Sequence, residues 1–408
     1  MSSEAVYLVG GAVRDELLGL EVGERDWVVT GSTPEALLKR GYRQVGASFP
    51  VFLHPETAEE YALARTERKQ GHGYHGFSVD FHPGVTLEED LERRDLTINA
   101  MARDARGGLI DPFGGQEDLD KRLLRHVSPA FTEDPLRVLR VARFAARFSH
   151  LGFLVDAGTL QLMRDITASG ELQHLAEERC WSELIGGLSA QTPSVYLDVL
   201  RECGALAVLL PEVDRLFGVP QPEQYHPEID TGVHVQMTLD YAARQGYPAE
   251  VRFALLLHDL GKGLTAPEEW PSHHDHEKTG LPLVRDVCAR LRAPTAFRDL
   301  AVIVSELHVL CHRAEELRPS RLLALLEQAD LLRRPERLEP FLQACESDFR
   351  GRKGLEQRPY PQTNTVKAAL EAVAAVKPAS MELEGLSGEQ IGLKIREARI
   401  EAISHQRR

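Results

Sequence analysis

The periodicity of apolar residues changes near Thr132, and this change limits the possible folds more than any other feature of the chain. Before that point, short β-branched runs end in glycine, as strands do when they lead into tight turns. After it, apolar residues recur every three or four positions, which is the spacing of a buried helix face. The sequence therefore predicts an α+β fold, with a mixed head at residues 1–131 followed by an all-helical body.

Four strands and one helix are predicted within the head. The strands cover Ala5–Val9, Trp27–Thr30, Val51–Leu53 and Tyr61–Arg65. The helix covers Glu35–Arg40, and the Ser32 hydroxyl is its predicted N-cap.

Length and proline content suggest how the body is divided. A chain of 408 residues is too long for one small core, so roughly two to four domains are expected. Prolines crowd the stretch before Thr231 and mark a linker, and a looser, proline-containing stretch covers Arg333–Thr365. We predict a head at 1–131, a helical region at 132–225, a second helical block at 226–332 and a helical tail at 333–408.

Charge and cysteine content limit the partners and the compartment. The net charge of −14 argues against nucleic-acid binding through bulk positive charge, so a phosphate-rich partner must be held at focused arginine clusters. Five scattered cysteines without CxxC spacing are typical of reduced thiols in a cytoplasmic protein. No stretch approaches the roughly 20 apolar residues that span a bilayer. We expect a cytoplasmic protein with no membrane partner, either a monomer or a homodimer.

Gly10 and Gly11 lie between the first predicted strand and a helix. Glycines at such a turn let backbone amides approach a phosphate closely, at the positive end of the helix. Arg14 follows on the first helical turn, where a guanidinium can pair a phosphate through two hydrogen bonds. A Gly-Gly pair alone is more often a plain turn, so both interpretations stay open at this point.

Glu24 and Asp26 stand two residues apart at the second predicted strand. Side chains two apart on a strand point to the same face, so the two carboxylates are expected to project together. Close carboxylates repel each other unless a cation lies between them, and Mg²⁺ prefers such oxygen ligands together with substrate phosphates. The pattern suits two-metal phosphoryl transfer. An isolated Glu-x-Asp is more often a solvated acidic pair, but the upstream Gly-Gly-Arg element favours the metal site.

Two later segments bear on the same predicted site. Arg93, Arg94 and Asp95 combine two cations with a carboxylate, which suits the grip on a triphosphate and a sugar but also an exposed charge cluster. The stretch Asp111–Gly115 (DPFGG) is predicted to be a structural turn.

A third segment carries an aspartate and three arginines spaced by three, which predicts one stripe along a helix: Asp134, Arg137, Arg140 and Arg143. Thr132 is the predicted N-cap of that helix, with Pro135 tolerated in its first turn. Aspartate accepts hydrogen bonds and arginine donates them. An Asp134–Arg137 pair can therefore read the pairing edges of cytosine and adenine, and reject guanine and uracil. The alternative is a basic helix face with an internal salt bridge.

Histidines and aspartates form a series in the second helical block. Its members are His234, His258, Asp259, His276, His308 and Asp330. Imidazole nitrogens beside carboxylates are typical ligands of a transition metal. Three nearby histidines (His273, His274 and His312) leave the individual ligand assignments open, and a vestigial domain without metal is the alternative.

Together, the motifs of the head resemble those of the bacterial-type (class II) tRNA nucleotidyltransferases, the CCA-adding enzymes of the polymerase-β superfamily. The matching segments are GGAVRDELLG, ERD, ERRDLTINA, DPFGG, EDPLRVLRVARF and EERCWSEL, in the family's order. The resemblance extends over essentially the whole chain and is closest to the subgroup with an extra HD domain. It implies a polymerase-β-like nucleotidyltransferase head that adds C, C and A to the tRNA 3′ end from CTP and ATP, without a template, and releases pyrophosphate.

The resemblance also implies roles for individual residues. Gly11, Arg14 and Arg94 would contact the incoming ATP or CTP, and Glu24 and Asp26 would hold Mg²⁺. The base and phosphate pocket would be lined by Asp134, Arg137, Arg140 and Arg143.

Glu24 departs from the family pattern, which usually has aspartate at this position. Glutamate keeps the charge and the oxygen ligands but lengthens the side chain by one methylene. We therefore expect retained activity with a changed preference between Mg²⁺ and Mn²⁺.

The histidine series resembles the HD phosphohydrolase superfamily. The resemblance implies that the block at 226–332 binds Ni²⁺ or another divalent transition metal through the six members of the series. It also implies hydrolysis of 2′,3′-cyclic phosphates, 2′-nucleotides and small phosphate esters.

Three other functions are consistent with parts of the sequence. A poly(A) polymerase has related head motifs, although the Asp134–Arg137 pair and the HD extension favour CCA addition. Glu24 makes an RNA-binding protein with an inactive head conceivable, and a protein acting mainly at the HD site would use the head as an RNA clamp. The Gly71–Phe77 loop and the Arg65–Lys69 patch are candidates for the switch from C to A addition.

Overall fold

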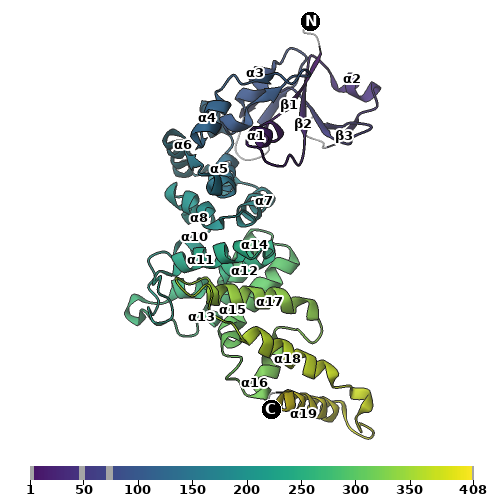
Figure 1. Cartoon of the computed structure of the whole chain (residues 1–408), viewed down its shortest axis with the longest axis vertical. Coiled ribbons are helices and arrows are strands. Elements are labelled where there is room, and N and C mark those ends of the chain that lie inside the picture. Colours follow the sequence, from purple (N-terminus) through teal and green to yellow (C-terminus); the bar gives the residue numbers. More distant parts are fainter. Residues whose placement is uncertain (1–3, 46–50, 70–76, 407–408) are drawn as a thin grey trace. The chain divides into compact units, whose positions relative to one another are not determined.

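The computed structural model describes residues 4–45, 51–69 and 77–406. The chain forms two compact units, one of Met1–Gly187 with Val195–Leu209 and the other of Leu188–Ser194 with Leu210–Arg408. Within the described residues, strands occur only in the first unit (Figure 1). The prediction of an α+β head followed by helices is confirmed, whereas the four-part division at residues 131, 225 and 332 stays a prediction.

A seven-stranded mixed sheet forms the head, in the order β3-β4-β5-β2-β1-β8-β9. Its strands are β1 (Ala5–Val9), β2 (Asp26–Thr30), β3 (Arg43–Val45), β4 (Val51–Leu53), β5 (Glu60–Leu63), β8 (Ala102–Arg103) and β9 (Leu109–Ile110). In this sheet β2 and β5 run parallel, and the other neighbours run antiparallel. A separate hairpin pairs β6 (Thr66–Lys69) with β7 (Phe77–Asp80).

Four helices accompany the sheet: α1 (Gly11–Leu17), α2 (Pro34–Lys39), α3 (Leu87–Glu92) and α4 (Gly115–Lys121). The predicted DPFGG turn leads into α4, where the Asp111 carboxylate accepts hydrogen bonds from the backbone N–H of Gly115 at 2.7 Å and of Gln116 at 2.9 Å. This segment is therefore a helix-capping turn.

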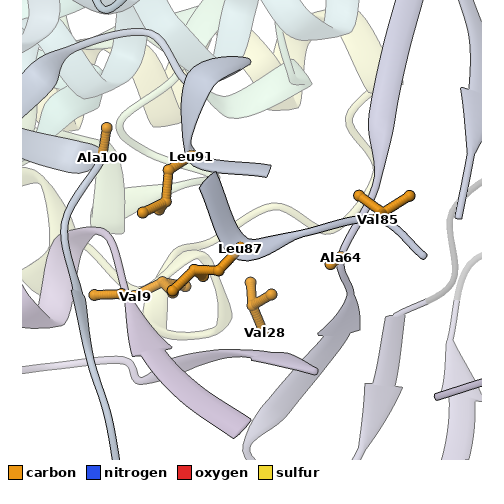
Figure 2. Packing of buried hydrophobic residues seen from close by; sticks show 8 residues of the cluster. Val9, Val28, Ala64, Val85, Leu87, Leu91 and Ala100 are labelled. Carbon is orange, nitrogen blue, oxygen red and sulfur yellow. The ribbon is translucent and has the colours of Figure 1, made fainter. Parts of the chain in front are cut away.

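Both faces of the sheet are buried. Val28 of β2 lies in one apolar cluster with Val9 of β1 and Leu87 of α3, side chains that Figure 2 shows together. The next residue, Val29, lies in a second cluster with Leu37 of α2. Because side chains alternate along a strand, the two valines point to opposite faces. The sheet is thus covered by α3 on one side and by α2 on the other.

The N-terminus of α2 differs from the prediction. Thr33, not Ser32, is the N-cap, and its hydroxyl accepts a hydrogen bond from the Ala36 N–H at 3.3 Å. Pro34 occupies the first helical position and keeps the residue before it extended, with φ −130° and ψ 161° at Thr33. The proline therefore decides which hydroxyl caps the helix.

A proline also determines where α5 (Leu136–Phe148) begins. Thr132, the predicted N-cap, lies in a 3₁₀ turn at Pro129–Glu133. Asp134 precedes a proline and is extended, with φ −110° and ψ 104°, and its Oδ1 accepts a hydrogen bond from the Leu136 N–H at 3.0 Å. Asp134 thus precedes the helix that carries the three arginines.

Four more helices lie wholly or largely in the first unit: α6 (Ala157–Ala168), α7 (Glu177–Leu188), α8 (Pro193–Glu202) and α9 (Ala205–Leu209). A short parallel pair, β10 (Leu123–Leu124) with β11 (Leu154–Val155), adds a strand beyond residue 131, where none was expected.

The described part of the second unit is helical. Its helices are α10 (Pro211–Asp214), α11 (Thr231–Arg244), α12 (Ala249–Leu257), α13 (His276–Thr279), α14 (Leu281–Arg290), α15 (Thr295–His312), α16 (Pro319–Gln328), α17 (Leu338–Arg350), α18 (Gln362–Ala375) and α19 (Gly388–Gln406). α12 is the central helix, since residues 253–257 are fully buried. It packs against α11, α15 and α17.

The expectation of a looser stretch at Arg333–Thr365 is wrong, because α17 lies inside it. Phe341 and Cys345 of α17 are fully buried. Pro340 is the third residue of this helix, where a missing N–H disturbs no intrahelical hydrogen bond.

All five cysteines are buried free thiols. In the described part of the chain, no helix has the length and apolar character needed to cross a membrane.

Candidate functional sites

A pocket of about 660 Å³ in the first unit contains every residue that the sequence predicted for nucleotide transfer. Nine arginines and four acidic residues contribute to its lining, so it is strongly cationic in a chain of net charge −14. The nine predicted residues are Gly11, Arg14, Glu24, Asp26, Arg94, Asp134, Arg137, Arg140 and Arg143. Folding therefore concentrates positive charge where an anionic substrate can be held.

The turn between β1 and α1 forms one wall of this pocket. Gly10 has a φ of +68°, and a Cβ at this position would lie 2.6 Å from Nη1 of Arg94. Arg94 Nη1 donates to the Asn99 carbonyl at 3.3 Å, and its Nη2 donates to the buried Asp90 at 3.3 Å. Only glycine allows both the backbone conformation and the close approach of this guanidinium.

Arg14 is held firmly within the unit. It is buried, pairs with Asp15 at 2.8 Å and donates from Nη1 to the Asn99 side chain. Its guanidinium also lies over the rings of Phe144 and Phe148. Burial lowers the pKa of Arg14, although Asp15 opposes the shift. Its place in the pocket is therefore fixed before any substrate binds.

The two predicted metal carboxylates do not share a strand. β2 begins at Asp26, and Glu24 lies in the preceding loop, so the expectation that both project from one strand face is wrong. Both nevertheless line the pocket. Burial by the pocket walls raises the pKa of the Asp26 carboxyl, Arg94 opposes this, and Glu24 adds to it. A divalent cation would relieve this repulsion, so the pair fits Mg²⁺.

Asp95 connects the segment after α3 to α5. Its Oδ2 accepts from Arg140 Nε at 2.7 Å, and its Oδ1 accepts from the Asn99 side chain at 2.9 Å. Although burial acts in the opposite direction, Arg140 and Asn99 hold the pKa of Asp95 well below its usual range. Asp95 thus fixes the position of a predicted nucleotide-binding arginine.

The EERCWSEL segment contributes two partners whose roles the sequence did not reveal. Arg179 Nη2 lies 3.0 Å from Asp134 Oδ2, and Glu183 Oε2 accepts from Arg143 Nε at 2.5 Å. Arg137 donates to the carbonyl oxygens of Ala130, at 2.8 Å, and of Arg93. The predicted base-reading residues are therefore held in place by α7 and by the backbone.

The two segments predicted to switch between C and A addition are described only in part. Arg65 lines the pocket, and residues 70–76 lie outside the described residues.

A second cluster of histidines and carboxylates lies at the centre of the helical unit. Five predicted residues meet there: His234 of α11, His258 and Asp259 at the end of α12, His276 of α13 and His308 of α15. Together with one further carboxylate they form two groups of potential metal ligands, one around His234 and His258, the other around Asp259, His276 and His308.

The last carboxylate of the cluster is Asp348, so the prediction of Asp330 is wrong. Asp348 Oδ1, from α17, lies 3.0 Å from His234 Nε2 and 3.8 Å from His258 Nε2. Asp330 has a φ of +56° after α16 and pairs with Arg334 at 3.6 Å. Asp348 lies in the stretch predicted as a helical tail, outside the block in which the ligands were expected.

The cluster fits a metal in its donor atoms and in their orientation. The Nδ1 atoms of His258, His276 and His308 lie 2.7–2.9 Å from backbone carbonyl oxygens, which can only accept a hydrogen bond. Each Nδ1 therefore donates a proton to the backbone, and each Nε2 faces the other side chains of the cluster. Burial lowers the pKa of His308 to about 3, which keeps this ring neutral. Both Asp259 oxygens are buried without a well-aligned hydrogen bond, although Lys262 Nζ lies 2.7 Å from Oδ2.

Glu228 joins two histidines beside this cluster. Its Oε1 lies 2.9 Å from His234 Nδ1 and 3.1 Å from His226 Nδ1. Although burial opposes the shift, hydrogen bonds from both histidines hold the pKa of Glu228 well below its usual range. A carboxylate on the far nitrogen of a ligating histidine fixes the ring and increases its basicity. This residue was not predicted.

The cluster opens into a pocket of about 400 Å³, whose lining includes Lys262, Arg313 and Arg352. Tyr225, with 57% of its surface exposed, also lines this pocket. Cations beside a metal-binding cluster suit a phosphate-bearing substrate. His273, by contrast, is structural, since its ring contacts Thr265 at 2.9 Å and the Pro220 carbonyl at 2.8 Å.

Three family models match the chain. The Poly A polymerase head domain matches residues 6–125, the probable RNA and SrmB-binding site of polymerase A matches residues 152–217, and the HD domain matches residues 231–334.

Curated relatives match over nearly the full length. A multifunctional CCA protein of Thioalkalivibrio sulfidiphilus is 60% identical over 397 residues, which cover 97% of this chain and 97% of the relative. A multifunctional CCA protein of Hahella chejuensis is 57% identical, covering 97% of this chain and 94% of the relative.

Solved structures share the fold at lower identity. The CCA-adding enzyme of Bacillus stearothermophilus in complex with CTP aligns with a TM-score of 0.68 and 24% identity, over 99% of this chain and 89% of that one. The Thermotoga maritima CCA-adding enzyme complexed with tRNA aligns with a TM-score of 0.60 and 19% identity, over 99% and 90% of the two chains. The resemblance inferred from the motifs is confirmed by the full-length relatives: the chain belongs to the family of multifunctional CCA proteins.

Proposed function

We propose that the first unit adds C, C and A to the 3′ end of tRNA from CTP and ATP, without a nucleic-acid template, and releases pyrophosphate. The observation that carries this proposal is that one cationic pocket is lined by all nine predicted residues. The chain also aligns over nearly its full length with relatives named multifunctional CCA proteins, which supports the same reaction.

The proposed roles follow from the chemistry of the side chains. Glu24 and Asp26 hold Mg²⁺, which when bound activates the attacking hydroxyl and stabilises the pyrophosphate. Arg14 and Arg94 bind the triphosphate beside the Gly11 backbone. The longer Glu24 side chain is proposed to change the preference between Mg²⁺ and Mn²⁺ rather than to abolish activity.

Base selection is assigned to Asp134 and Arg137, with Arg140 and Arg143 completing the base and phosphate pocket. Arg179, which pairs with Asp134 at 3.0 Å, keeps that carboxylate oriented. An acceptor beside a donor matches the pairing edges of cytosine and adenine.

The proposal is tested with a tRNA transcript that ends immediately before CCA, incubated with labelled CTP, ATP and Mg²⁺. We expect growth by C, C and A for the wild type, and loss of base choice for Asp134→Ala. Glu117→Ala is the matched control, because this exposed acid of α4 lies outside the pocket. A long A tail would instead identify a poly(A) polymerase. If the tRNA is not extended with either Mg²⁺ or Mn²⁺, the proposal is refuted.

A second activity is proposed for the helical unit, supported by the His–Asp cluster and the cationic pocket beside it. Its substrates would be 2′,3′-cyclic phosphates, 2′-nucleotides and small phosphate esters, with Ni²⁺ or another divalent transition metal. The proposed ligands are His234, His258, Asp259, His276 and His308, with Asp348 in place of Asp330. The proposed site thus takes one ligand from α17, which follows the predicted boundary at residue 332.

Hydrolysis of 2′,3′-cyclic AMP and of p-nitrophenyl phosphate, with and without Ni²⁺, tests the second activity. Asp259→Ala should abolish both reactions, whereas Asp286→Ala, at an exposed aspartate of α14, should leave them intact. Equal hydrolysis by both variants would show that the cluster is not the site. We place both activities in the cytoplasm, as the five free thiols suggest.

A further inference from the structure

Asp90 is a buried carboxylate of the first unit that lies behind the nucleotide pocket. The described residues that line the pocket do not include it, and 1% of its side chain is exposed. It lies in α3 between Leu87 and Leu91, whose side chains point into the apolar cluster of the head (Figure 2). Residues three or four apart share a helix face, so α3 carries this acid inward with its apolar side chains. A carboxylate in such a place is costly unless cations pair with it.

The partners of Asp90 come from two segments of the chain. Its Oδ1 accepts hydrogen bonds from Arg93 Nη2 at 2.7 Å and from the backbone N–H of Arg65 at 3.3 Å. Its Oδ2 accepts from Arg94 Nη2 at 3.3 Å. Although burial opposes the shift, Arg93 and Arg94 hold the pKa of Asp90 below its usual range. The carboxylate therefore stays charged, and all three arginines that it contacts line the pocket.

The backbone of Arg65 is held from both sides. Asp90 accepts from its N–H, and Arg93 Nε donates to its carbonyl oxygen at 3.1 Å. Arg65 lies between β5, which belongs to the main sheet, and β6, which belongs to the separate hairpin. The Asp90–Arg93 pair therefore fixes the point at which the chain leaves the sheet beside the pocket.

Arg93 also connects Asp90 to α5. The Arg93 carbonyl oxygen accepts a hydrogen bond from Arg137 Nη2. On the other side of Asp90, Arg94 Nη1 donates to the Asn99 carbonyl oxygen at 3.3 Å. A continuous series of polar contacts therefore joins Arg94, which is proposed to bind the triphosphate, to Arg137, which is proposed to read the base.

This connection matters because the two arginines act on opposite ends of one nucleotide. The ribose joins the base to the triphosphate over a limited span, so the pocket can select a base only if both contacts are correctly spaced. A misplacement of about 1 Å can cost on the order of 100-fold in rate. A buried carboxylate with several charged partners confines them to one arrangement.

We propose that Asp90 is a positioning residue for nucleotide selection, which keeps Arg94 and Arg137 correctly spaced. The inference rests on the proposed nucleotide transfer and adds the residue that joins triphosphate binding to base choice. Loss of the Asp90 charge should therefore weaken both together. A purely structural acid would instead change the amount of folded enzyme and leave the base choice of the folded fraction unchanged.

Asp90→Asn tests this role, because it keeps the size of the side chain and removes its charge. The full-length variant is assayed on the tRNA transcript that ends immediately before CCA, with CTP or UTP as the only nucleotide, and kcat and KM are measured for each. We expect the KM for CTP to rise at least about tenfold, because Arg94 loses its carboxylate partner. The ratio of kcat/KM for CTP to that for UTP should also fall at least about tenfold, because Arg137 is no longer held in place through Arg93.

Three further variants complete the experiment. Glu88→Gln makes the same chemical change at an exposed position of α3 and should match the wild type in KM and in the ratio. Asp90→Glu keeps the charge and should restore part of both. Arg93→Lys keeps a cation and the backbone carbonyl but has one nitrogen with which to contact both Asp90 and Arg65. It should lower the ratio, and it repeats the test if thermal unfolding shows that Asp90→Asn does not fold.

A wild-type ratio in Asp90→Asn overturns the inference, and so does an equal fall in kcat for both nucleotides. A higher KM with an unchanged ratio also overturns it, because Asp90 would then act on Arg94 alone. If the wild type adds neither nucleotide, the proposed nucleotide transfer is refuted and this inference with it. Addition of C by the wild type together with unchanged base choice in the variants refutes the inference alone.

Discussion

At the residue scale, Glu228 acts on the metal cluster through His234. Its Oε1 lies 2.9 Å from His234 Nδ1, so the carboxylate orients the ring whose Nε2 faces Asp348 Oδ1. We expect Glu228→Gln to weaken Ni²⁺ binding by about 10- to 100-fold, because an amide supports the imidazole less strongly than a carboxylate. Isothermal titration calorimetry measures this change, with the exposed Glu223→Gln as control. Equal affinities in the two variants would contradict the positioning role.

Asp95 supports the nucleotide pocket in a comparable way, through Arg140. Its pKa is depressed, so the stability it contributes is present above its unfolded pKa of about 4 and is lost as the pH falls below that value. We expect Asp95→Asn to lower the free energy of unfolding by about 2 kcal/mol at pH 7. The loss is not larger because the Arg140 side chain is 35% exposed and solvent screens the pair. Urea unfolding at pH 7 and pH 3.5 should show the wild type beginning to lose this advantage, the rest of which disappears only as the pH approaches the depressed folded pKa, whereas the variant has none to lose. Glu117→Gln, in an exposed pair with Lys121, should unfold like the wild type at both pH values.

At the element scale, the turn between β1 and α1 depends on Gly10. Gly10 and Gly19 share a φ of +68°, but only the Cβ of Gly10 would meet Arg94, at 2.6 Å, whereas Gly19 has nothing within 4 Å. Both alanine variants should therefore have a free energy of unfolding that is lower by about 1 kcal/mol, because alanine is strained in the left-handed conformation. Gly10→Ala alone should also displace Arg94 and weaken ATP and CTP binding by at least about tenfold. Thermal unfolding and nucleotide titration separate the two effects, and equal nucleotide affinity in the two variants would contradict the role of the turn.

Helix α17 decides which carboxylate completes the metal cluster. Asp348 lies on this helix within 3.0 Å of His234 Nε2, whereas Asp330 pairs with arginines elsewhere in the unit. We expect Asp348→Asn to lower the number of Ni²⁺ ions per chain and Asp330→Asn to leave it unchanged. Metal analysis of the two purified variants decides between them, and the reverse result would restore the assignment made from the sequence.

At the scale of the whole molecule, each site is built by one unit alone. The nucleotide pocket takes all its residues from the first unit, and the metal cluster takes all of its residues from the second. Asp26→Ala should therefore abolish CCA addition and leave phosphate-ester hydrolysis within twofold, and Asp259→Ala should do the opposite. Both assays on both variants test this independence, which a joint loss of the two activities would refute.

The features that could be predicted from the sequence are those that depend on the local chemistry of neighbouring residues. The Gly-Gly turn, β1 and the α+β character depend on backbone preferences and on periodicity, which neighbouring residues fix. Errors arose where two local signals competed. Pro34 and Pro135 determine where α2 and α5 begin, so the capping residues differ from the predicted Ser32 and Thr132.

The linear order of residues established the family and the α+β class. It also predicted nine of the residues that line the pocket of the first unit, because each lies in a short motif whose chemistry is local. It did not reveal Asp348, Glu228 or the division of the histidines into two groups. Those depend on which side chains meet when α11, α12, α15 and α17 pack around a common core. Contacts between segments more than 100 residues apart, such as His234 with Asp348, leave no periodic trace in the chain and arise only from burial and packing.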